Sequence, residues 1–122
     1  MKIAIYCVNY HSYDSLKHYI GSIEQAVLAT GKAIEVSVFV ADNSCPAEQF
    51  EYNPKRISVE VVSIGENIGY FRAVNRLMKI HKPTVYNYTI ISNVDVLLSN
   101  NFFSQLQTMP YSPNVGWIAP QI

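Results

Sequence analysis

The feature that most constrains the fold is an apolar run near the amino terminus, residues 3–8, in which no residue is charged. A half-buried strand alternates apolar and polar residues. A continuous apolar run of this length instead indicates a strand covered on both faces, as in parallel sheets. Polar residues follow at once, and Ser12 or Asp14 can cap a helix there. The chain therefore begins with the strand-to-helix transition that is typical of α/β proteins.

Strand and helix patterns continue to alternate along the chain. Apolar residues recur at helical spacing from 16 to 27, and Gly31 is a suitable end for that helix. Strands are predicted over 35–41, 57–64 and 88–92, with the strand at 57–64 nearer an edge, and a second helix is predicted over about 70–82. A loop is predicted over 45–56, a short helix after Asn101 and the start of a fifth strand at 115–119. This order predicts a single α/β domain over residues 1–122, with a mainly parallel sheet flanked by helices.

Polar clusters follow the first, second and fourth predicted strands, and another precedes the second helix. They are the segments 9–14, 42–44, 93–95 and 67–69. In a parallel sheet the carboxyl ends of the strands share one edge, and ligands of open α/β sheets bind there. We therefore expect the four clusters to meet at one rim and to form a ligand site.

The triplet Asn93-Val94-Asp95 is the candidate metal site. In an extended backbone, Asn93 and Asp95 point to the same side. Their oxygens suit a hard divalent cation, Mg²⁺ or Mn²⁺, which can in turn hold a diphosphate. The alternative is a strand end capped by a polar turn, in which Asp95 is only solvated.

The other clusters each allow a binding role and a plainer one. Asp42 can accept hydrogen bonds from a ribose or base, or the Asp42–Ser44 segment can form a turn that bonds its own backbone. The turn before the second helix, ending in Gly69, can bind phosphate at the helix amino terminus or be an ordinary turn. Arg72 can pair with a phosphate or be solvated, and Tyr10 can stack on a base or pack at the rim.

Composition and motifs exclude several classes of protein. Hydrophobic residues make up 49% and charged residues 15%, so the chain is globular. The net charge is +0 and no run of Lys or Arg stands out, so no nucleic-acid partner is expected. Neither G-x-G-x-x-G nor a P-loop sequence occurs. Cys7 and Cys45 have no metal-ligand spacing, and no signal peptide or membrane-spanning stretch is evident. We expect a cytoplasmic protein, and peripheral association with the inner face of the membrane stays open.

Taken together, the segments resemble family 2 glycosyltransferases of GT-A fold, especially the rhamnosyltransferase-like branch. The match runs in order through nearly the whole chain. It departs from the family pattern at Asn93, where the first carboxylate of a D-x-D-type motif would stand. The segments that carry the resemblance are residues 8–12, 40–44, 67–75 and 93–96, and Val115-Gly116 with Pro120.

The resemblance implies a Rossmann-like GT-A fold whose amino-terminal, donor-binding half is this chain. It implies transfer of a sugar from a UDP- or dTDP-linked donor to a hydroxyl of a surface glycan or lipid-linked precursor. The catalytic base is expected beyond Ile122, and the 122-residue chain alone is expected to be inactive. The competing interpretation is a non-catalytic nucleotide-binding or interaction module. Asp95 would hold the divalent cation, and the expected nucleotide-sugar residues are Asn9, Tyr10, Asp42, Asn43, Asn67, Gly69, Arg72 and Asn93.

Overall fold

The computed structural model describes residues 1–31 and 33–119 and contains one four-stranded parallel sheet in the order β3-β2-β1-β4. The strands are β1 (Lys2–Asn9), β2 (Glu35–Asp42), β3 (Ser58–Ser63) and β4 (Tyr88–Ser92). All three strand pairs are parallel. The predicted α/β class and the edge position of β3 are therefore confirmed.

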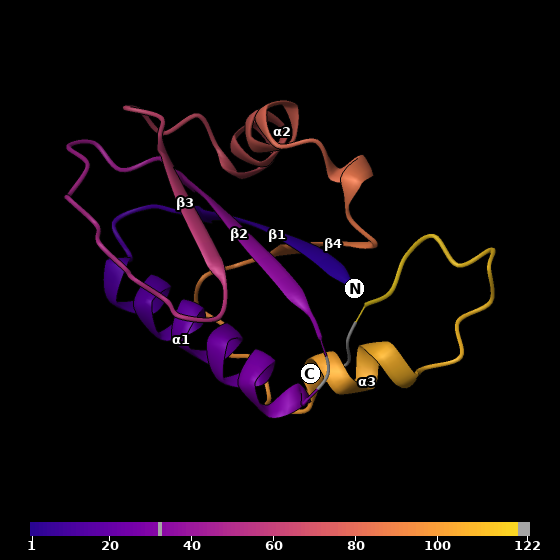
Figure 1. Ribbon diagram of the computed structural model, residues 1–122. Coiled ribbons are helices and arrows are strands. Elements are labelled where there is room, and N and C mark those ends of the chain that lie inside the picture. Colours follow the sequence, from indigo (N-terminus) through magenta and orange to yellow (C-terminus); the bar gives the residue numbers. More distant parts are fainter. Residues whose placement is uncertain (32, 120–122) are drawn as a thin grey trace.

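Helices cover both faces of this sheet (Figure 1). Helix α1 (Tyr13–Thr30) and the short helix α3 (Phe102–Thr108) lie on one face, and α2 (Tyr70–Ile80) lies on the other. A 3₁₀ turn, η1 (Pro83–Val85), links α2 to β4 and was not predicted. Among the described residues, no helix combines the length and apolar character needed to cross a membrane.

The unbroken apolar sequence of β1 reflects burial on both faces. Ile3, Ile5 and Cys7 pack in the core with α1, whereas Ala4 and Tyr6 pack in the core with α2. Successive side chains of a strand point to opposite faces, so each of these cores needs an apolar residue at every second position. The buried part of α2 that completes the second core consists of Ala73, Val74 and Leu77.

Helix α1 follows its predicted apolar stripe closely. Leu16, Ile20 and Ile23 are fully buried, and the helix ends at Gly31, whose φ of 65° places it in the left-handed region. Glycine tolerates this conformation without a steric cost, which explains the position of the helix end. Leu28, by contrast, is 49% exposed and lies outside the buried stripe.

The predicted fifth strand at 115–119 is wrong. These residues have no regular secondary structure, and Trp117 is 90% exposed. A strand requires a neighbouring backbone to satisfy its N–H and C=O groups, and no strand among the described residues pairs with this segment. Pro120, which contributed to the resemblance, lies outside the described residues.

Candidate functional site

The parallel register brings the predicted polar clusters to a single rim. Asn9 at the end of β1 lies opposite Asp42 at the end of β2, and Asp42 lies opposite Ser63 of β3. On the other side of β1, Cys7 lies opposite Ser92, so Asn93 directly follows the last paired residue of β4. The loops that carry the candidate residues thus leave the same edge of the sheet, as the sequence predicted.

Asp42 is the centre of a buried hydrogen-bond network at this rim. Its Oδ1 accepts from Asn9 Nδ2 at 3.1 Å and from the Ser44 N–H at 3.1 Å, and its Oδ2 accepts from the Tyr13 hydroxyl at 2.7 Å. The side chain is 2% exposed. The Tyr13 oxygen also accepts from the Glu48 N–H at 2.8 Å, so the network joins β1, β2, α1 and the loop after β2.

The hydrogen bonds keep the Asp42 carboxylate ionised. Burial by itself raises the pKa of Asp42, but the hydrogen bonds donated by Ser44, Tyr13 and Asn9 outweigh burial and hold that pKa below its ordinary value. A buried carboxylate therefore fixes the start of α1 and the turn after β2 relative to each other. The bond from the Ser44 N–H is also the self-bonded turn that the sequence offered as the plainer alternative for this segment.

Two further amide side chains shape the adjoining loops. Asn9 Oδ1 accepts from the Ser12 N–H at 3.1 Å, at the beginning of α1. Asn67 Oδ1 accepts from the Gly69 N–H at 3.1 Å and from Asn43 Nδ2 at 3.3 Å, just before α2. Asn43 is 1% exposed and thereby ties the end of β2 to the start of α2.

The amino terminus of α2 is open for an anion. Gly69 is the N-cap residue and no side chain caps the helix, which leaves N–H groups of its first turn without a side-chain acceptor. The first turn contains no acidic residue but does contain Arg72. A cation here opposes the helix dipole, whereas an anion is favoured by the dipole, the N–H groups and the guanidinium together.

Gly69 is required for this geometry, and its substitution should show it. Its φ of 83° and ψ of 164° lie in a region that is essentially restricted to glycine, although an added Cβ would meet no atom within 4 Å. We expect Gly69→Ala to lower the free energy of unfolding by about 1–3 kcal/mol through backbone strain. Gly116→Ala is the matched control in urea unfolding, because Gly116 has no positive φ and equally open surroundings. Equal effects of the two substitutions would refute the strain argument.

The remaining candidates project from the rim into solvent. Tyr10 is 53% exposed, and Arg72, Asn93 and Asp95 are also exposed. No hydrogen bond or ion pair within the described part of the chain engages the Asp95 carboxylate. The rim thus combines a buried set that orders the loops (Asn9, Asp42 and Asn43) with an exposed set available to a ligand (Tyr10, Asn67, Gly69, Arg72, Asn93 and Asp95).

A known structure shares this architecture. The chain superposes on the crystal structure of residues 1–349 of TarS from S. aureus, a wall teichoic acid glycosyltransferase, with a TM-score of 0.63. The chain has a glycosyltransferase fold. Sequence identity is 13%, and the match covers 88% of this chain but only 31% of the TarS chain, so this chain spans about a third of the length of that crystallised chain. No family model and no curated protein matches the sequence.

The side-chain oxygens of Asn93 and Asp95 suit a divalent cation that is bound jointly by the protein and a ligand. Among residues 1–31 and 33–119, no group of three or more His, Cys, Asp or Glu side chains is placed to hold a metal. Asn93 and Asp95 are both exposed, and Val94 and Asp95 lie in a bend that follows the end of β4. Mg²⁺ is commonly held by one or two carboxylates together with substrate phosphates and water, and these residues fit that kind of site.

Sequence reasoning gave Tyr13 no role of its own within the cluster 9–14, and it anticipated Ser44 only as part of the turn at 42–44. Both appeared as ordinary polar residues near the ends of strands. Their role depends on the β1–β2 register, which places Asn9 beside Asp42 and brings the first turn of α1 over the end of β2. The sequence did contain a signal for this role. Tyr13 and Ser44 lie shortly after the ends of two strands that were expected to be parallel neighbours, so both could have been placed near Asp42.

Proposed function

We propose that this chain is the donor-binding part of a glycosyltransferase that uses a UDP- or dTDP-linked sugar. The observation that carries the proposal is the meeting, at one rim, of a buried carboxylate network, an uncapped helix amino terminus with Arg72, and the exposed Asp95. The fold that the chain shares with TarS supports the same role. Family 2 and its rhamnosyltransferase-like branch remain part of this proposal.

Each part of the rim would then act on a different part of the donor. Tyr10 offers an exposed ring to the base, and the loops ordered by Asp42 and Asn43 shape the place for the nucleoside. The α2 N–H groups and the Arg72 guanidinium would bind the diphosphate. A divalent cation on Asp95 would offset negative charge on the leaving diphosphate.

The proposed reaction exchanges one bond at the anomeric carbon for another. The bond from that carbon to the diphosphate oxygen breaks, and the acceptor hydroxyl oxygen forms a new bond to the same carbon. The hydroxyl proton must pass to a base, and no residue at this rim is assigned that role. A hydroxyl of a surface glycan or of its lipid-linked precursor is the proposed acceptor.

The test is the contribution of the diphosphate to affinity. Titration calorimetry with Mn²⁺ should show that UDP or dTDP binds at least tenfold more tightly than the corresponding nucleoside, because charge-assisted hydrogen bonds to phosphate add about 1.5–3 kcal/mol. Arg72→Gln should remove most of that difference, whereas Arg56→Gln, at an exposed arginine away from the rim, should leave it unchanged. Absence of binding by both nucleotides would overturn the proposal.

The second candidate is a nucleotide-binding or interaction module that has this fold without catalysis. Incubation of the protein, together with any residues that follow Ile122, with UDP- and dTDP-sugars distinguishes the two. Release of the nucleoside diphosphate, with transfer to an added acceptor or to water, supports the enzyme. Tight nucleotide binding without release from any donor supports the module.

A further inference from the structure

The side of α2 that faces away from the sheet concentrates positive charge. Of the nine basic residues in the sequence, four lie between positions 72 and 82, and no acidic residue lies between Glu66 and Asp95. Arg72, Arg76 and Lys79 recur at intervals of four and three residues, so they form one stripe along the helix. All three are exposed. We call this stripe, with the exposed Phe71 and Ile80 beside it, the α2 outer face.

No acidic partner neutralises this charge within the described residues. The ion pairs found there are Lys2 with Glu35 and, near the end of α2, His81 with Glu60. The stripe is therefore positive on a protein whose net charge is +0. Cations near the end of a helix are explained by the helix dipole, but Arg72 in the first turn is opposed by it. The distribution thus points to an external anion rather than to helix stability.

Apolar side chains flank the stripe on both sides. Phe71 is 74% exposed and Ile80 is 53% exposed, and Val85 of the following turn η1 is 69% exposed. Successive residues of an α-helix lie about 100° apart around the helix axis. In a view along the axis of α2, Phe71 and Ile80 therefore lie on opposite sides of Lys79. A basic stripe with apolar residues at its margins is the pattern of surfaces that lie at the membrane interface.

We propose that the α2 outer face docks the protein on a membrane surface rich in anionic lipid. Nucleic acid is a poorer fit, because the aliphatic Ile80 and Val85 cannot stack on bases but can enter the boundary between headgroups and acyl chains. The face begins at Phe71, two residues after Gly69 on the candidate donor rim, and α2 is only about 16 Å long. Docking there would place the rim beside the membrane, where a lipid-linked acceptor would be found.

The α2 outer face shares only Arg72 with the proposed nucleotide site, so the proposal can be tested without nucleotide through Arg76 and Lys79. Sedimentation of the purified chain with phosphatidylglycerol-containing vesicles should show binding that pure phosphatidylcholine vesicles do not. The double variant Arg76→Gln/Lys79→Gln should lower the partition coefficient by roughly 30-fold, since each basic residue near an anionic surface contributes a factor of about five. Phe71→Ser should reduce the binding that survives at high salt.

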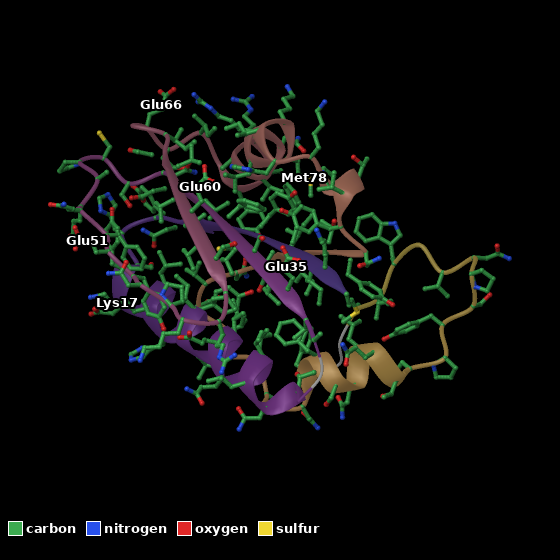
Figure 2. All side chains as sticks on the ribbon, viewed as in Figure 1. Lys17, Glu35, Glu51, Glu60, Glu66 and Met78 are labelled. Atoms are coloured by element: carbon green, nitrogen blue, oxygen red, sulfur yellow. The ribbon has the colours of Figure 1, made fainter. Side chains whose placement is uncertain are left out.

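The control removes equal charge from the other face of the sheet. Lys17 and Lys55 are both exposed, and Lys17 lies on α1, across the sheet from Met78 on α2 (Figure 2). Lys17→Gln/Lys55→Gln should therefore bind vesicles like the unchanged protein. Far-ultraviolet circular dichroism and the melting temperature confirm that each variant is folded.

Three outcomes would overturn the proposal. One is the absence of any preference for anionic vesicles in the unchanged protein. Another is an equal loss of binding in the α2 variant and in the α1 control, which would indicate a net-charge effect without a specific surface. The third is tighter binding to a single-stranded oligonucleotide than to vesicles, with the same dependence on Arg76 and Lys79. Loss of nucleotide binding with intact vesicle binding would refute only the proposed function.

Discussion

Replacing Asp95 with alanine should abolish the effect of Mn²⁺ or Mg²⁺ on the affinity for UDP or dTDP. Asp95 is the sole carboxylate of the triplet after β4, and no three or more His, Cys, Asp or Glu side chains among residues 1–31 and 33–119 are grouped to hold a metal. A cation shared between the protein and a diphosphate would therefore lose its charged protein ligand. We expect the cation-dependent gain in affinity, roughly tenfold to a hundredfold, to disappear in calorimetric titrations with and without metal.

Two further variants make this test specific. Asn93→Asp should hold or strengthen the cation dependence, because a carboxylate is a better ligand than an amide for a hard cation. Glu66→Ala removes another exposed carboxylate, from the turn after β3, and should leave the cation dependence unchanged. If Asp95→Ala binds nucleotide in the presence of metal as tightly as the unchanged protein does, Asp95 is only a solvated residue at a strand end.

The sheet could be predicted because its sequence signals are local and strong. The run at 3–8 requires cover on both faces, and the strands alternate with amphipathic helices, which leaves few topologies besides a parallel sheet. The same logic predicted the rim, because the carboxyl ends of parallel strands all lie at the same edge of the sheet. Asn9, Asp42 and Asn93 are brought to that rim by backbone register alone.

The remaining features depend on contacts between distant parts of the chain. The bond from the Tyr13 hydroxyl to Asp42 joins residues 29 positions apart, and its formation depends on how α1 sits over the sheet. The segment 115–119 shows the opposite kind of error, because a strand was predicted there and none is present. Its composition favours a strand, but a strand also needs a neighbour with free backbone groups, and local sequence does not report whether one is present.

Asp42→Ala should cause the largest loss of stability of any substitution at the rim. The side chain is 2% exposed, and its removal leaves the Asn9 amide and the Ser44 N–H without their acceptor in a buried place. Each such donor costs about 1–3 kcal/mol, so we expect a loss of about 3 kcal/mol in the free energy of unfolding. The melting temperature should fall by on the order of 10 °C. Glu48→Gln, at an exposed carboxylate in the adjoining loop, is the control and should change stability little.

The same network should also give the protein an acid-sensitive stability that Asp42→Asn removes. Because the pKa of Asp42 is lower in the folded protein than in the unfolded chain, the unfolded chain binds more protons as the solution is acidified. The contribution of Asp42 is therefore fully present above about pH 5 and is lost as the pH falls through the folded-state pKa. Urea unfolding at a series of pH values should show a shallower decline below pH ~5 for Asp42→Asn than for the unchanged protein. If the free energy of unfolding declines equally steeply with falling pH in both proteins, other carboxylates cause the decline. The buried network would then not hold Asp42 in its ionised form.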